Sequence, residues 1–264
     1  MTVSSSPVSD IHPTALIDPS AELAPGVSVG PYSIIGANVR VGARTRIAGH
    51  VLIERDTTVG EECTIHHGAV LGTDPQDLKY MGEPTSLLVG DRTVIREYAT
   101  LNRGTAALGH TRVGSDCMLM AYVHVAHDCS LGNHVILSNA VNMAGHVSIG
   151  DWAIVGGLTP IHQFVRIGAH AFVGGATRVH KDVPPFVKAA GSPMELYGLN
   201  SVGLQRRGFS DDVRRELKRA YRLFFASSHN TSQALARARE ELSAIPEVEI
   251  FLSFFAETER GVGP

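Results

Sequence analysis

The 264-residue chain lacks the features that mark membrane-spanning or exported proteins. No apolar run approaches the roughly 18 residues that suggest a membrane span, so we expect no transmembrane segment. The opening residues, MTVSSSPVSD, contain neither a basic region nor an apolar stretch, which argues against a signal peptide. We therefore interpret residues 1–10 as a flexible tail and expect a cytoplasmic protein.

Cysteine is also scarce, and the charge is close to balanced. The three cysteines are odd in number and show no CxxC spacing, which argues against a disulfide framework and against a zinc finger. The formal net charge of −3 provides no basic excess of the kind that marks nucleic-acid binding. The composition predicts a soluble globular protein without a nucleic-acid partner.

The dominant feature of the sequence is a six-residue repeat. Every sixth residue from Ile11 to Leu71 is Ile, Val or Leu, and the same phase returns at 89–101 and again at 113–179. Met143 is the only member of this series that is not a branched aliphatic residue. We number the six positions of each repeat from this residue, which is position one.

This period is typical of a parallel β-helix, in which three repeats form one coil. It fits neither the period of about 3.6 residues of an α-helix nor the simple alternation of a strand. Position one should point inward, and the glycine that is most common at position two should permit the turn. Position five is small or β-branched and should fill the corners, so we interpret the residues found there as core: Cys63, Cys117 and Cys129.

Two stretches interrupt the repeat and divide the β-helix, which we place at 11–185. They are 73–87 (TDPQDLKYMGEPTSL) and 106–112 (AALGHTR), and we interpret both as loops. Loops that leave a rigid scaffold often carry binding residues. Elsewhere residues 18 apart should stack on one another in adjacent coils, about 4.8 Å apart.

The repeat ends near 182–185, and the rest, 186–264, reads as a small helical domain. Ser210 is a suitable N-cap because Asp211 and Asp212 follow it in the first turn. A second helix is predicted after 230–232 and a third at Pro246, since proline is favoured at the first helical position.

Five strings carry a family resemblance: QDLKYMGEPT (76–85), HVAHDC (124–129), AGHV (144–147), HQF (162–164) and RRGF (206–209). With them the chain resembles the UDP-N-acetylglucosamine O-acyltransferases, which are hexapeptide-repeat enzymes. The resemblance implies a homotrimeric left-handed β-helix that transfers a 3-hydroxyacyl group from acyl carrier protein to the 3-hydroxyl of UDP-N-acetylglucosamine. This transfer is the first step of lipid A biosynthesis. The resemblance also implies that the reaction uses no cofactor, no metal and no covalent acyl-enzyme.

Such a transfer requires a base for the alcohol proton and donors for the developing oxyanion. His127, at position three, should point away from the core, and its imidazole can accept a proton near neutral pH. The family has its catalytic histidine at this position. Gly145 follows by 18 residues, so it should leave room beside His127 and present a backbone N–H, an oxyanion donor in the family. The resemblance suggests that Asp128 orients His127, although adjacent side chains on a strand diverge.

Other residues match positions with further roles in the family. Gly175 stands where acyl-chain length is set, and a glycine there implies a longer chain. The basic residues at 214–222 line one helix face, which would suit the acidic acyl carrier protein. Eight residues match substrate-binding positions: Asp77, Lys79, His124, His146, His162, Gln163, Asn200 and Arg206.

Alternative functions stay open at this stage. A trimeric zinc enzyme of the γ-carbonic anhydrase type is also built on such repeats, and the chain has thirteen histidines. His127 should stack on Gly145 and Gln163, so one column cannot provide three ligands, although a neighbouring subunit could. The N-acyltransferase of the same pathway acts on a UDP-amino sugar, but it normally carries an extra N-terminal domain. The exact chain length, and a 3-amino analogue as acceptor, also stay open.

Overall fold

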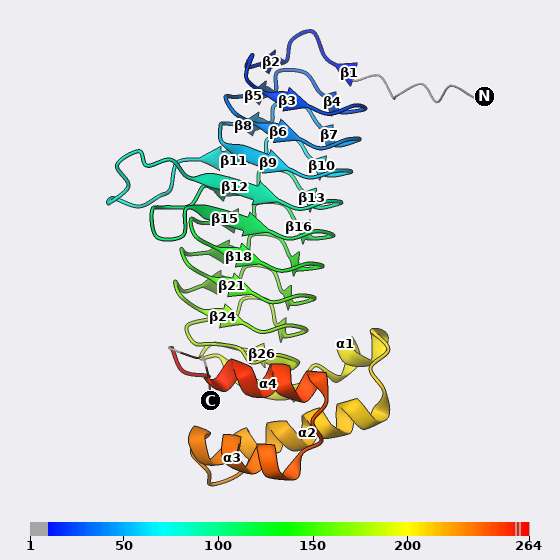
Figure 1. Ribbon diagram of the computed structural model, residues 1–264, viewed down its shortest axis with the longest axis vertical. Coiled ribbons are helices and arrows are strands. Elements are labelled where there is room, and N and C mark those ends of the chain that lie inside the picture. Colours follow the sequence, from blue (N-terminus) through cyan, green and yellow to red (C-terminus); the bar gives the residue numbers. More distant parts are fainter. Residues whose placement is uncertain (1–9, 257, 259, 264) are drawn as a thin grey trace, which may run out of the picture.

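The six-residue repeat winds the chain into a long, three-sided, left-handed parallel β-helix with helices at one end (Figure 1). The computed structural model describes residues 10–256, 258 and 260–263. Residues 1–9 of the predicted tail lie outside the described residues, and Asp10 already belongs to the first strand. The predicted fold class, mainly β with a small C-terminal helical part, is confirmed.

Each side of the β-helix is one sheet of very short strands. The first sheet has 11 strands: β1 (Asp10–Ile11), β4 (Ser28–Val29), β7 (Arg46–Ile47), β10 (Thr64–Ile65), β13 (Val94–Ile95), β16 (Met118–Leu119), β19 (Ile136–Leu137), β22 (Ile154–Val155), β25 (Phe172–Val173), β26 (Val187–Ala190) and β27 (Glu195–Leu199). The second has eight: β2 (Leu16–Ile17), β5 (Ile34–Ile35), β8 (Leu52–Ile53), β11 (Val70–Thr73), β14 (Thr100–Asn102), β17 (His124–Val125), β20 (Asn142–Met143) and β23 (Pro160–Ile161). The third also has eight: β3 (Glu22–Leu23), β6 (Arg40–Val41), β9 (Thr57–Val59), β12 (Ser86–Val89), β15 (His110–Val113), β18 (Ser130–Leu131), β21 (Ser148–Ile149) and β24 (Arg166–Ile167).

The register follows the predicted spacing. Ile17 pairs with Ile35, 18 residues along, and most neighbouring strands repeat this offset. The offset grows where the chain leaves the coil, because Val70 pairs with Thr100 and Thr100 pairs with His124. The first departure is a projecting arm, 74–85, between β11 and β12. The second is a shorter loop at 103–109, earlier than the predicted 106–112, because the chain from His110 pairs with β12.

Glycine is required at position two of the repeat, but the reason predicted for it, a turn conformation, is wrong. The left-handed backbone conformation occurs at position four, where it is adopted by residues such as Asn38, with φ of 58°. Gly36, at position two, is needed because adjacent coils approach closely there. A Cβ atom on Gly36 would lie 1.7 Å from the backbone oxygen of Glu54.

The interior is filled by positions one and five, as predicted. Cys63, Cys117 and Cys129 are free thiols that are buried in the corners. Burial raises the pKa of Cys129 to about 12, so this thiol is a poor nucleophile at neutral pH.

Four helices follow the last coils: α1 (Ser201–Arg206), α2 (Asp211–Phe225), α3 (Thr231–Glu241) and α4 (Pro246–Ala256). Ser210 caps α2 as predicted, since its side chain accepts a hydrogen bond from Val213 N. Helix α3 begins at Thr231, because the Asn230 side chain accepts a hydrogen bond from Gln233 N. The sequence did not predict α1, nor the strands β26 and β27, which continue the first sheet past residue 185.

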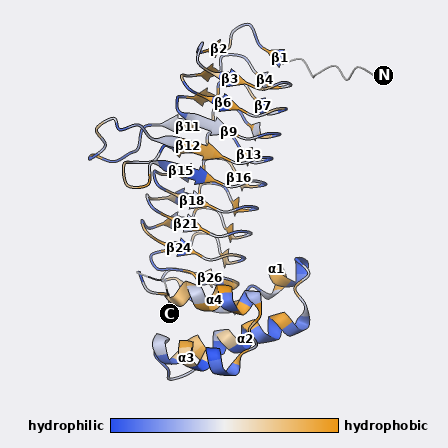
Figure 2. Ribbon diagram, viewed as in Figure 1, coloured by the Kyte–Doolittle hydropathy of each residue, from blue (hydrophilic) through white to orange (hydrophobic). Residues whose placement is uncertain are grey.

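The helices enclose a second hydrophobic core. In Figure 2 they carry hydrophobic and strongly hydrophilic residues close together, as amphipathic helices do. Leu204, Leu217 and Phe251 are fully buried between them, and Phe186 joins this core to the end of the β-helix. Among the described residues, no helix is both long and apolar enough to cross a membrane.

Candidate active site

His127 lies just after β17, at the corner where the second sheet gives way to the third. Its Nδ1 is 2.8 Å from Asp128 Oδ2. Because an ionised carboxylate can only accept, Nδ1 carries the proton in this pair and Nε2 is left to accept one. The side chain is 12% exposed, so the imidazole is largely shielded but still reachable.

Asp128 can meet the preceding side chain because it is not on a strand. It occupies position four, with a left-handed φ of 57°, and this turn brings the two side chains to the same side. The divergence expected for strand neighbours therefore does not apply. Burial is the largest influence on the Asp128 carboxyl and opposes its charge, yet hydrogen bonds from His127 and Thr105 hold its pKa below the usual value.

Gly145 lies one coil beyond His127, as the spacing predicted. A Cβ atom on Gly145 would stand 2.5 Å from His127 Cε1 and 2.7 Å from Nε2, closer than any real contact. The glycine therefore creates the space that the imidazole occupies, and it brings the backbone beside Nε2.

His146 approaches the same carboxylate from the next coil. Its Nε2 is 3.7 Å from Asp128 Oδ2, and its ring meets that of His127 edge-on. The ligand atoms of His127, Asp128 and His146 lie within 4.8 Å of one another, a spacing that a metal ion could use. This grouping of three residues from two adjacent coils was not predicted from the sequence. Within this grouping, Asp128 Oδ2 already accepts two hydrogen bonds, one from His127 Nδ1 and one from Thr105 Oγ1.

A polar groove opens beside these residues on the second sheet. His124 lies in it, and its Nδ1 is 2.7 Å from Thr100 Oγ1. Burial, and then the neighbouring His127, lower the pKa of His124, which keeps this ring neutral. Ten residues line the groove: Gln76, Thr100, His124, Ala126, His127, Asn142, Met143, Ala144, Gly145 and Gln163. Gln76, Thr100 and Asn142 were missed from the sequence, although Gln76 lies in one of its signature strings.

His162 and Gln163 extend the site along the next coil. His162 is exposed, and its Nδ1 lies 3.2 Å from the backbone oxygen of Gln163. Phe164 follows and stacks on His146 with ring centroids 4.6 Å apart, which fixes the plane of that imidazole. Phe164 received no role in the prediction, although it lies 18 residues beyond His146 and within the HQF string.

Asp77 and Lys79 lie on the projecting arm, outside the groove. Asp77 Oδ1 accepts a hydrogen bond from Lys79 N at 2.9 Å, so the two residues form one tight turn. Figure 1 shows the arm extending away from the β-helix, with only its base near the coils. Within a single chain, Gln76 is the arm residue that reaches the groove.

Asn200 and Arg206 lie in a separate hollow beside α1, against the first sheet. Asn200 is largely buried and uses both ends of its amide within the chain, because Nδ2 donates to His170 O and Oδ1 accepts from Gly203 N. Arg206 is exposed. Gly175 is exposed at the corner between the first and second sheets, where a Cβ atom would lie 3.2 Å from Gly157 O. These three residues are not brought together with His127 in one chain.

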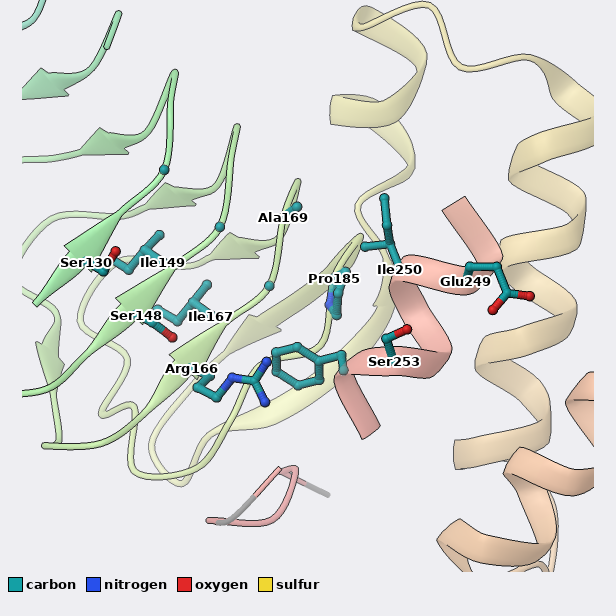
Figure 3. A pocket seen from close by; sticks show the side chains of 14 residues that line it. Ser130, Ser148, Ile149, Arg166, Ile167, Ala169, Pro185, Glu249, Ile250 and Ser253 are labelled. Carbon is teal, nitrogen blue, oxygen red and sulfur yellow. The ribbon is translucent and has the colours of Figure 1, made fainter. Parts of the chain in front are cut away.

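Another hollow lies between the third sheet and α4, and Figure 3 shows its lining. Ser130 and Ser148 line one wall, and the guanidinium of Arg166 sits 4.7 Å above the ring centre of Phe254 on α4. None of the site residues predicted from the sequence lies in this hollow, so the groove at His127 is the better candidate.

Comparison with known proteins points to one enzyme family. A family model described as UDP N-acetylglucosamine O-acyltransferase, domain 2, matches residues 182–263, and a bacterial transferase hexapeptide model matches 110–143. The acyl-[acyl-carrier-protein]–UDP-N-acetylglucosamine O-acyltransferase of Thermodesulfovibrio yellowstonii is 48% identical over 81% of this chain and 83% of its own length. Its counterpart in Chlorobaculum parvum is 59% identical over 77% of each. The crystal structure of UDP-N-acetylglucosamine O-acyltransferase (LpxA) from Moraxella catarrhalis has a TM-score of 0.94 and 42% identity, covering 96% of this chain and 99% of the other.

Proposed function

Because the chain belongs to the UDP-N-acetylglucosamine O-acyltransferase family, we propose that it catalyses the first step of lipid A biosynthesis. It transfers a 3-hydroxyacyl group from acyl carrier protein to the 3-hydroxyl of UDP-N-acetylglucosamine. The observation that carries the catalytic part of the proposal is the hydrogen-bonded pair of His127 and Asp128, which faces Gly145 in a polar groove.

In this mechanism His127 is the general base. Nε2 takes the proton of the sugar hydroxyl as its oxygen attacks the thioester carbonyl of the donor. The backbone N–H of Gly145 stabilises the developing oxyanion. When the C–S bond breaks, the new ester is complete and the proton passes to the departing thiolate. Asp128 holds Nδ1–H and stabilises the imidazolium that forms between these steps.

The remaining site residues match roles in binding. Asp77 and Lys79 contact the sugar nucleotide, and Gln163, Asn200 and Arg206 help to hold its nucleotide part. The three histidines bind substrate: His124, His146 and His162. An exposed arginine such as Arg206 suits phosphate oxygens. Gly175 leaves the acyl channel open, which favours a longer 3-hydroxyacyl chain. The basic residues of α2 provide a docking face for the acidic carrier protein.

We also propose a homotrimer that acts in the cytoplasm. The support for a multi-subunit site is that the His127 groove and the Arg206 hollow lie on different sheets of one chain. A neighbouring copy can bring the second set to the first, and the projecting arm can reach across in the same way. The second sheet also exposes apolar side chains, with Leu16 64% and Ile34 43% exposed, which association would cover.

The test compares the native protein with His127→Ala in a transfer assay that contains acyl carrier protein loaded with 3-hydroxyacyl chains of several lengths. We expect native activity that falls about 10²- to 10⁴-fold in the variant, because a general base contributes that much. Activity that survives the substitution would move the base elsewhere, with His146 the next candidate. A native protein that acylates only a 3-amino acceptor would correct the acceptor. Failure with every chain length and both acceptors would remove the acyltransferase assignment, and bound zinc in the purified protein would then favour the metal enzyme.

A further inference from the structure

We propose that Thr105, in the loop at 103–109, is a positioning residue that fixes the carboxylate of Asp128 and so orients His127 for proton transfer. The inference rests on the proposed role of His127 as the base. It gives this short loop a task that neither the repeat nor the signature strings indicate.

The contacts of Thr105 cover both carboxylate oxygens of Asp128. Its hydroxyl donates to Oδ2 at 2.7 Å, and its backbone N–H donates to Oδ1 at 3.0 Å. The backbone N–H of Leu108 adds a weaker bond to Oδ1 at 3.3 Å. With the bond from His127, four donors surround one carboxylate, which restricts its rotation.

Strand β15, which follows the loop directly, holds the backbone of Asp128. The N–H of Asp128 donates to the hydroxyl of Thr111, just past the loop, at 2.9 Å. The carboxylate side chain is fully buried. The direction of this carboxylate is therefore set largely by a loop that leaves the coil 20 to 23 residues earlier in the chain.

The hydroxyl of Thr105 and the imidazole of His127 share Oδ2. Removing the hydroxyl leaves the full negative charge of that oxygen to His127, so the carboxylate stabilises the imidazolium more strongly. Two other titratable groups face the His127–Asp128 pair. His146 Nε2 lies 3.7 Å from Asp128 Oδ2, and His124 lies across the groove. The substitution removes no contact of either histidine. The acid limb of kcat/KM should therefore move to higher pH. The carboxylate is also freer to rotate, so kcat should fall.

The test uses Thr105→Val, which keeps the shape and removes the hydroxyl, and Thr105→Ser, which restores it. We expect about a tenfold loss of kcat in Thr105→Val, as for one hydrogen bond to a charged group, with an unchanged KM for UDP-N-acetylglucosamine. The acid limb of its kcat/KM profile should lie at higher pH than that of the native enzyme. Thr105→Ser should recover the native kcat and profile.

Thr45→Val is the matched control, because Thr45 is buried, donates to Gly60 O and accepts from Cys63 N in a coil remote from the groove. It should lower thermal stability without moving the acid limb. Thr105 is only half-buried, so the valine variant should fold, and Thr105→Ala removes the same hydroxyl if it does not.

Two results would overturn the inference. A Thr105→Val enzyme with native kcat and a native acid limb shows that the hydroxyl does not orient the pair. A Thr105→Ser enzyme as impaired as Thr105→Val shows that the effect comes from the loop's packing. Either result leaves the proposed function intact as long as the native enzyme is active and His127→Ala is not.

Discussion

Gly145 leaves no space for a side chain beside the imidazole of His127. A glycine-to-alanine change at this position should therefore displace the proposed base, His127, directly rather than by weakening the fold. The imidazole must turn or shift by a large part of an ångström, and Nε2 moves with it. The backbone N–H of residue 145 remains, so the loss isolates the position of the base.

We expect Gly145→Ala to lower kcat by about 10²-fold, the cost of misplacing a reacting group by roughly 1 Å. Steady-state kinetics of purified protein measure this. Gly49→Ala is the control, because a Cβ atom there would be crowded too, but by backbone, at 2.9 Å from Pro31 O in a distant coil. Equal loss in both variants would mean that the β-helix tolerates neither change, and that the imidazole is not the point of failure.

His170 provides a second prediction at this scale. Burial, followed by the nearby Arg207, lowers its pKa to about 4. The folded chain then binds fewer protons than the unfolded chain between pH about 4 and 6.5, so stability falls as the pH drops through this window. After allowance for partial solvent screening, the loss at pH 5 is on the order of 1 kcal/mol.

The urea midpoint of the native protein should accordingly be lower at pH 5 than at pH 7.5. His170→Phe keeps a ring against Phe186, which stacks on His170 with centroids 5.5 Å apart, and removes the titration. This variant should show a smaller drop. An identical drop in both proteins would assign the pH dependence to other groups.

At the scale of elements, the projecting arm is anchored by a buried arginine. The side chain of Arg103 is fully buried and donates to the backbone oxygen of Gly72, to the Asp74 carboxylate and to Tyr80 OH. Asn102 supports it, with Nδ2 donating to Thr73 Oγ1 at 2.7 Å and to Asp74 O at 2.9 Å. The arm therefore leaves the coil in a fixed direction.

Arg103→Met should loosen the arm, since it leaves the Gly72 carbonyl and Asp74 without their buried donor. We expect faster amide hydrogen exchange at 74–85, a several-fold higher KM for UDP-N-acetylglucosamine, and a loss of about 1–3 kcal/mol in the free energy of unfolding. Arg55→Met is the control, because its exposed ion pair with Asp74, at 3.5 Å, contributes little. An arm as protected in Arg103→Met as in the native chain would contradict this anchoring.

Elements that depend on interactions between residues close in sequence, or on the repeat, were predicted correctly. Those that depend on contacts between distant residues were not. Coils and their stacking follow from the six-residue period, and α2 and α4 follow from Ser210 and Pro246 at their starts. The pairing of Gly145 with His127 follows from the 18-residue coil. Thr105 could not be predicted, because its bond to Asp128 spans 23 residues, an offset that depends on the conformation of a loop. The two strands after 185 were missed because they carry no repeat.

At the scale of the whole molecule, the proposed trimer would bring the two groups of proposed site residues together from two subunits. If each cleft takes His127 from one chain and Arg206 from another, two different inactive proteins can complement one another. Mixed trimers of His127→Ala and Arg206→Ala subunits, formed by refolding the two together, should recover part of the native activity. Unmixed trimers of either variant should not. Absence of recovery in verified mixed trimers would place the complete site within one chain.

Because each coil of the β-helix has a fixed number of residues, the chain can gain or lose length only in certain steps. One full coil is 18 residues, so deleting that number beyond β20 would draw the helices about 4.8 Å nearer to His127 and keep every residue on its own face. Deleting six residues would instead rotate all that follows by one face, so α1 and the strands it packs against would lie on a different side of the β-helix relative to His127. Changes in reach along the axis are therefore open to this fold in steps of whole coils, whereas the arm and the loop can vary residue by residue.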